Sequence, residues 1–114
     1  MMRAMTGSLP YIPDNTDLLM RGWLEEAVTK GGREKRSKRW VVLRKRDISL
    51  YSDVVTSLER RLACYQMAGI SDICYQNEPT QHWFSFRTPS GPIKFYAPDR
   101  EDREKWLTAL RTWV

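Results

Sequence analysis

Residues 21–43 read RGWLEEAVTKGGREKRSKRWVVL. Aromatic and β-branched residues at both ends of this stretch suit a pleated, half-buried strand. Between them, the Gly31-Gly32 pair indicates a turn, because glycine reaches positive φ without a steric clash. We therefore expect a β-hairpin whose strands lie near 20–28 and 38–45, joined by a long, positively charged tip.

Positive charge is concentrated in this hairpin. Nine of the 19 Lys and Arg residues fall between Lys30 and Arg46, with a single acid, Glu34, so the segment carries +8. The remaining sequence carries −3, although the whole chain has a formal net charge of +5. A pole of this kind attracts anions, which could be the phosphates of a membrane, a nucleic acid or an acidic protein.

The chain has 114 residues, enough for one domain with one core. It contains no apolar run near the ~20 residues that a membrane-spanning helix needs, so we expect any contact with a membrane from one side. Cys64 and Cys74 favour a reduced, buried pair over a disulfide. His82 lacks partners at metal-ligand spacing, and no catalytic or phosphate-loop pattern stands out. We therefore expect no metal, no cofactor and no enzymatic activity.

Short strands separated by turn residues continue along the chain. They are expected at 48–51, 62–67, 70–75, 82–87 and 93–97, and with the two hairpin strands they make seven. Short links of this kind favour antiparallel pairing. Residues 1–17 have no periodicity and are expected to be a flexible lead-in.

A helix is expected after the last strand. Asp99 can cap its N-terminus, and Trp106, Leu107, Leu110 and Trp113 recur at a spacing that places them on one face. The sequence therefore predicts a bent sheet or open barrel, one end of which is closed by a C-terminal helix of roughly 14 residues.

These features resemble a pleckstrin homology (PH) domain. The resemblance covers about residues 20 to 114, in a domain that we place at 18–114, and it rests on an ordered set of residues: Arg21-Gly22-Trp23-Leu24, Lys38-Arg39-Trp40-Val41-Val42-Leu43, Leu50-Tyr51 and Trp106 in the closing helix. It implies a mainly β fold of seven antiparallel strands in two near-orthogonal sheets, an open barrel capped by one C-terminal α-helix. It also implies no catalysis, and a role in recruiting proteins to membranes through phosphoinositides or in binding other proteins.

The sequence departs from the family at the positions that resemble its phosphoinositide site. Members that bind these lipids stereospecifically carry a Lys two residues after the Leu of the first strand and a Lys/Arg-x-Arg motif in the second. Here Arg39 fits the final Arg, whereas Glu26 and Ser37 occupy the other two positions. Glu26 is expected to face the mouth between the two strands, near Arg39, where its charge repels a phosphate. The basic loop then serves a less selective contact, or a neighbouring pocket on its other side.

We therefore expect a module that docks on anionic lipid headgroups (a phosphoinositide, phosphatidylserine or phosphatidic acid) at the cytoplasmic face of membranes. The expected lipid-binding residues are Lys30, Arg33, Lys35, Arg36, Lys38, Arg39, Arg44 and Tyr51. For Tyr51, which resembles the phosphate-binding tyrosines of similar domains, ordinary packing remains an alternative.

A protein-interaction module of the same fold, which would bind an acidic partner, is the alternative function. Nucleic acid is not expected, because the loop offers no aromatic platform on which bases could stack. Trp40, which follows the loop, is expected in the core.

Overall fold

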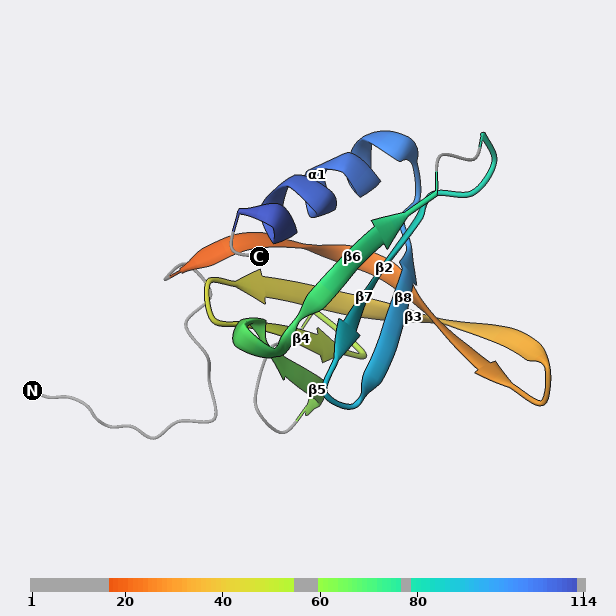
Figure 1. Ribbon diagram of the computed structural model, residues 1–114, viewed down its shortest axis with the longest axis horizontal. Coiled ribbons are helices and arrows are strands. Elements are labelled where there is room, and N and C mark those ends of the chain that lie inside the picture. The colour runs from red at the N-terminus through yellow and green to blue at the C-terminus, as the bar shows by residue number, and fades with distance from the viewer. Residues whose placement is uncertain (1–16, 55–59, 77–78, 113–114) are drawn as a thin grey trace, which may run out of the picture.

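The computed structural model describes residues 17–54, 60–76 and 79–112 (Figure 1). All seven predicted strands and the predicted helix are present. The strands are β2 (Leu18–Lys30), β3 (Arg33–Arg44), β4 (Asp47–Tyr51), β5 (Arg61–Gln66), β6 (Ser71–Tyr75), β7 (Trp83–Thr88) and β8 (Gly91–Tyr96), and the helix is α1 (Arg100–Arg111). A 3₁₀ turn, Met67–Gly69, follows β5. The expected lead-in falls on residues outside the described ranges, apart from Asp17.

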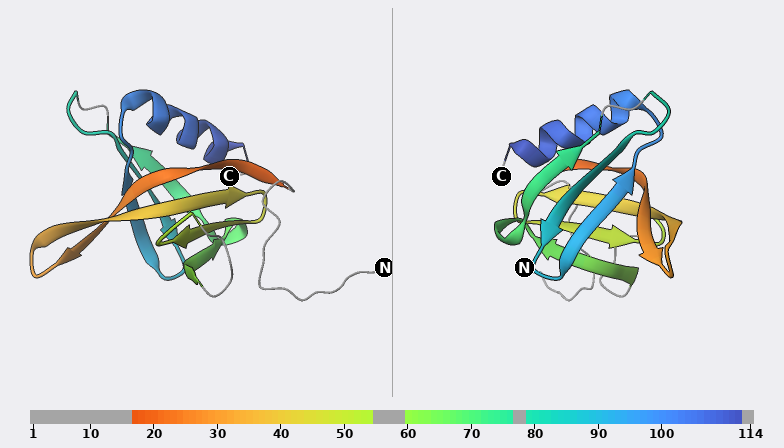
Figure 2. Two further views of the ribbon diagram at one scale, coloured as in Figure 1. Left: turned by 180° about the vertical axis from the view of Figure 1, so that it is seen from behind. Right: turned by 45° about the vertical axis from the view of Figure 1, so that its right-hand side comes forward.

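The strands pair antiparallel in the order β5-β4-β3-β2-β8-β7-β6. The four strands β5 to β2 form one half of this sheet, and β8, β7 and β6 cross them steeply as the other half (Figures 1 and 2). The halves meet where Glu25, Glu26 and Ala27 of β2 pair with β8. Within the described residues β5 and β6 end the order without pairing to each other. The predicted open, mainly β barrel with a C-terminal helix is confirmed, and the two sheets implied by the resemblance are the two halves of one continuous seven-stranded sheet.

The β2–β3 hairpin is longer than the sequence predicted. The two strands pair from Leu18 opposite Arg44 to Lys30 opposite Arg33, so the turn itself consists of Gly31 and Gly32 alone. These glycines have φ values of 58° and 78°, as a two-residue type I′ turn requires. The expectation of a long basic loop was therefore wrong, because strand pairing continues through the basic residues.

The hydrophobic core lies between the sheet and α1. Trp106 is fully buried and stacks on Phe84 with ring centroids 6.4 Å apart. A Cβ placed on Gly22 would lie 3.7 Å from the Trp106 ring, so α1 packs closely against β2. The helix closes one end of the barrel, as predicted. The core around Trp106 includes Leu24, Val41, Leu43, Ile48, Leu50, Phe86, Phe95, Leu107 and Leu110.

Helix α1 is capped and anchored by polar contacts. The side chain of Asp99 accepts a hydrogen bond from the Asp102 backbone N–H at 2.7 Å, which confirms the predicted cap. Arg103, only 1% exposed, donates to the Gln76 carbonyl at 2.7 Å and so fastens the helix to the end of β6. Trp113 lies outside the described residues. No helix among those described is long and apolar enough to cross a membrane.

The two cysteines are both free, on the strands that end the sheet order. Cys64 on β5 is half-buried and Cys74 on β6 is exposed. Neither cysteine forms a disulfide with another described residue, and the expectation that both would be buried was wrong, because β6 presents Cys74 to solvent.

Candidate anion-binding surface

Antiparallel pairing gives the β2–β3 hairpin two faces with different chemistry. Successive side chains of a strand point to opposite sides, so the register fixes which residues lie together. We call the side that continues the barrel core the inner face. It extends past Leu24 and Val41 with Glu26, Val28, Lys30, Arg33, Lys35, Ser37 and Arg39. The outer face holds Trp23, Glu25, Ala27, Thr29, Glu34, Arg36, Lys38 and Trp40.

Three cations, which we call the tip cations, occupy the inner face beside the turn: Lys30, Arg33 and Lys35. Lys30 lies opposite Arg33, and Lys35 lies opposite Val28, which is 42% exposed. The tip cations are exposed, and none of them makes an ion pair, hydrogen bond or cation–π contact with the described part of the chain. Neighbouring like charges across a strand pair repel, and a bound anion would relieve that repulsion.

An ion pair occupies the mouth of the inner face, nearer the barrel. Arg39 Nε donates to Glu26 Oε1 at 3.1 Å, and the two side chains are only 26% and 16% exposed. Glu26 faces the mouth near Arg39, as expected from the sequence. Burial, with the charge of Glu26 as a second cause, raises the pKa of Tyr65 on β5. The mouth therefore holds a carboxylate that neutralises Arg39.

On the outer face, four side chains form a network that we call the outer clamp: Glu34, Arg36, Lys94 and Tyr96. Glu34 is its hub. One carboxylate oxygen accepts from Tyr96 Oη at 2.8 Å and from Arg36 Nε at 3.4 Å, and the other accepts from Lys94 Nζ at 3.2 Å. The Arg36 guanidinium also lies 3.5 Å from the centroid of the Tyr96 ring. The charge of Arg36 is thus compensated by Glu34 of the same chain.

These contacts shift two ionisation equilibria. The hydrogen bond from Tyr96 lowers the pKa of Glu34, and the contacts from Lys94 and Arg36 lower it further against the opposing effect of burial. For Lys94, burial alone would lower the pKa, but its contacts with Tyr96 and Glu34 outweigh that effect and raise it. Both groups are therefore held in their charged forms at neutral pH.

Lys38 and the two tryptophans of the hairpin also lie on the outer face. Lys38 Nζ is 4.7 Å from the centroid of the Trp23 ring, and Trp23 meets Trp40 edge to face at 5.3 Å. The expectation that Trp40 lies in the core was wrong. Because Val41 points inward, its neighbour Trp40 must point outward, where it is half-buried.

Two of the expected contact residues lie away from the tip. Arg44 and Tyr51 are 7% and 0% exposed, respectively. Arg44 ends the 12-residue strand β3, so it is roughly 35 Å from Arg33 at the other end. That distance is several times the Debye length of ~8 Å at physiological salt. Neither side chain is placed to share an anion with the tip cations, and we leave both out of the proposed site.

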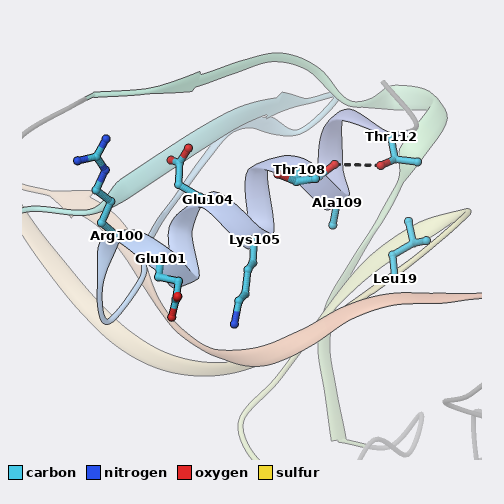
Figure 3. Close-up of a pocket in the computed structure, with 8 residues that line it drawn as sticks. All are labelled: Leu19, Arg100, Glu101, Glu104, Lys105, Thr108, Ala109 and Thr112. Carbon is cyan, nitrogen blue, oxygen red and sulfur yellow. Dashed lines mark hydrogen bonds between the residues drawn. The ribbon is translucent and has the colours of Figure 1, made fainter.

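The groove along α1 does not compete with this surface as an anion site. It has a volume of about 840 Å³ and lies between the helix and Leu19 of β2 (Figure 3). Its charged lining consists of two cations and two acids, Arg100, Lys105, Glu101 and Glu104, which fan out without converging (Figure 3). Among the residues described, no group of three or more His, Cys, Asp or Glu could hold a metal ion.

Sequence reasoning missed the outer clamp. The alternation Glu34-Lys35-Arg36 would have placed Glu34 and Arg36 on one face if strand pairing had been extended to Gly31. Lys94 and Tyr96, however, are 60 and 62 residues away from Glu34 in the chain. No local pattern reports a contact of that kind, because it depends on how β8 packs beside β2.

The PH domain family model matches residues 18–113, whereas comparison with curated proteins finds no match. Among solved structures, the chain is similar to the N-terminal PH domain of human ARAP2, with a TM-score of 0.65, 22% identity, and coverage of 89% of this chain and 82% of that one. The PH domain of human pleckstrin homology domain-containing protein family A member 5 gives a TM-score of 0.69 at 19% identity, with 96% and 87% covered. The PH domain of human oxysterol binding protein-related protein 11 gives a TM-score of 0.63 at 21% identity, with 81% of this chain and 76% of that one covered.

Proposed function

The chain belongs to the PH domain family, and on that premise we propose that it is a peripheral membrane module for the cytoplasmic face of membranes. It binds anionic phospholipids through the inner face of the β2–β3 hairpin. PH domains generally mediate interactions with membrane lipids or proteins and are generally non-catalytic. The observation that carries the proposal is the set of three tip cations, Lys30, Arg33 and Lys35, which are exposed and without internal partners in the described structure.

Electrostatics sets the expected strength of this contact. Each Lys or Arg held close to an anionic membrane surface contributes about 1 kcal/mol, so the tip cations together contribute about 3 kcal/mol. The field falls off over a Debye length of ~8 Å, which favours charges at the projecting end of the hairpin (Figure 2). Arg36 adds less, because Glu34 and Glu25 already lie beside it.

The ion pair at the mouth argues against a highly selective headgroup site. A phosphate that entered beside Arg39 would have to displace Glu26, which lies 3.1 Å from it. Separating a half-buried ion pair leaves one charge without its partner, and this is costly. We therefore propose a contact with anionic lipid in general, phosphatidylserine and phosphatidic acid included, in which charge density matters more than the arrangement of phosphates.

The test compares equal losses of charge at two ends of the same strand. Arg33→Gln with Lys35→Gln removes two tip cations, whereas Lys45→Gln with Arg46→Gln removes two cations beside the other end of β3. Binding is measured by co-sedimentation with phosphatidylcholine vesicles that contain phosphatidylserine, at low and high salt. We expect the tip variant to bind roughly 30-fold more weakly, about 2 kcal/mol, the remote variant to change by less than about 3-fold, and high salt to weaken all three proteins. Equal losses in the two variants would contradict the proposal.

A protein-interaction module is the second candidate, and the Glu26–Arg39 ion pair is the observation that favours it. With that pair in the mouth, the tip cations could face carboxylates of an acidic protein segment instead of phosphates. An aspartate- and glutamate-rich peptide, added to the same two variants, discriminates between the candidates. Binding of this peptide without binding to anionic vesicles would replace the membrane proposal with the second one.

A further inference from the structure

The turn end of the β2–β3 hairpin extends beyond the part of β2 that pairs with β8. Pairing between β2 and β8 ends at Ala27 opposite Lys94, but pairing between β2 and β3 continues to Lys30. Residues 28–35 therefore project past the barrel (Figures 1 and 2). An isolated two-stranded hairpin is only marginally stable in water, so this projecting part needs further support to keep one orientation.

The space below the projecting part is not filled by the core. A cavity of about 510 Å³ opens where β2 and β8 separate, and Val28, Thr29, Glu34, Pro92 and Ile93 are among the residues that line it. At the turn, neither Gly31 nor Gly32 has another residue within 4 Å of the position that a Cβ would take. Backbone pairing to β8 and apolar packing therefore do not fix the angle of the tip.

The outer clamp crosses this gap. Glu34 belongs to β3, two strands away from β8 in the sheet, yet it accepts hydrogen bonds from Tyr96 and Lys94 of β8 at 2.8 and 3.2 Å. Its side chain is only 31% exposed, and Tyr96 is 5% exposed. Hydrogen bonds to a charged, partly buried group are stronger than the average.

We propose that Glu34 and Tyr96 are positioning residues for the proposed membrane contact, an inference that rests on the proposed function. The clamp fixes the projecting hairpin against β8, so that the tip cations approach a surface together. Holding them in one arrangement before binding avoids an entropic cost of ordering them on binding. Glu34 thus supports binding of anions although its own charge opposes them.

Tyr96→Phe is the decisive variant, because it removes the hydrogen bond to Glu34 but keeps the ring and the net charge. Tyr75→Phe is its matched control, since it removes the hydroxyl of a 43% exposed tyrosine on β6. The centroid of the Tyr75 ring lies 5.1 and 5.3 Å from the guanidinium groups of Arg103 and Arg111, contacts that phenylalanine keeps. Amide hydrogen exchange is measured without lipid, and affinity is measured on vesicles of phosphatidylcholine and phosphatidylserine.

We expect Tyr96→Phe to accelerate exchange several-fold at residues 28–35 while Trp106 and the other core residues keep their protection. Vesicle affinity should fall by about 3- to 10-fold at unchanged net charge, and Tyr75→Phe should match the wild type in both measurements. Glu34→Gln adds a second arm: attraction alone predicts about 5-fold tighter binding from the added positive charge, whereas a clamp predicts no gain or a loss.

The two measurements separate failure of this inference from failure of the proposed function. Unchanged exchange at residues 28–35 in Tyr96→Phe would overturn the clamp. Faster exchange with unchanged vesicle affinity would overturn its positioning role. If the wild-type protein bound no anionic vesicles, the proposed function and the positioning role would both be wrong. The hydrogen-exchange measurement alone would still decide whether Glu34 and Tyr96 hold the hairpin.

Discussion

The two faces of the β2–β3 hairpin both carry cations, but they differ in what those cations contact. On the inner face, Lys30, Arg33 and Lys35 make no ion pair with any described residue. On the outer face, Arg36 lies against Glu34 and the Tyr96 ring. A net charge counted along the sequence therefore overstates the charge that a ligand can use, because strand alternation sends two of the six cations between Lys30 and Arg39 to the outer face, where Glu34 compensates Arg36.

The inner face itself is divided. At its tip the cations are without partners in the described structure, whereas at its mouth Glu26 forms an ion pair with Arg39 at 3.1 Å. The tip therefore suits a diffuse anionic surface, and the mouth does not suit a single, tightly held phosphate. Substitutions at the mouth can remove this difference between the mouth and the tip.

Glu26→Lys combined with Ser37→Arg should make the mouth resemble the tip. The two positions lie opposite each other in the register, so the pair of substitutions places two cations beside Arg39. Charge-assisted contacts to phosphate are among the stronger hydrogen bonds. We expect multiply phosphorylated phosphoinositides in vesicles to bind at least ~10-fold more tightly, a gain of ~1.4 kcal/mol or more.

The control for this double variant is phosphatidylserine at matched surface charge. General attraction would raise both affinities equally, whereas a restored pocket would raise chiefly the affinity for the phosphoinositide. An equal gain on the two lipids would show that the mouth does not form a headgroup site even with basic residues, and the tip would remain the better candidate.

A smaller effect is expected on the outer face when Glu34 is protonated. The folded protein holds the pKa of Glu34 below 4.5, so its charged form stabilises the fold above that pH, and the contribution disappears as the pH falls through the lowered pKa. Tyr96, Lys94 and Arg36 are the groups that face it. At neutral pH the wild type should exceed Glu34→Gln in unfolding free energy by about 0.5 kcal/mol, because solvent screens the charge of this partly exposed carboxylate.

Denaturant midpoints of the wild type and Glu34→Gln, compared from neutral pH to well below 4.5, measure this contribution. The difference between the two proteins should shrink in acid. A difference that stayed constant over the whole range would mean that the outer clamp does not depend on the charge of Glu34.

Much of the fold could be predicted from the sequence because it is encoded locally. Alternating apolar residues indicate the strands, Asp99 marks the start of α1, and the spacing of Trp106, Leu107 and Leu110 identifies its buried face. The Glu26–Arg39 contact could also be anticipated, because the family resemblance places both residues at known positions of a hairpin.

The extent of the hairpin could not be predicted in the same way. Lys30, Arg33 and Lys35 have little preference for strands, so their composition indicated a loop, whereas the Gly31-Gly32 turn allows pairing up to its very edge. Once those residues are in strands, their alternation decides which are available to an anion. The contact between Glu34 and Tyr96 depends on tertiary packing and has no signature in the sequence near either residue.

The most direct test uses two lysines of β3 that lie on opposite faces and outside the outer clamp. Lys35→Gln and Lys38→Gln each remove one positive charge from the same strand. Binding to vesicles of phosphatidylcholine and phosphatidylserine is measured for both variants at one salt concentration. We predict a loss of roughly 5-fold for the inner-face variant and at most about 2-fold for the outer-face variant. Equal losses would mean that total charge, and not the face that carries it, governs membrane binding.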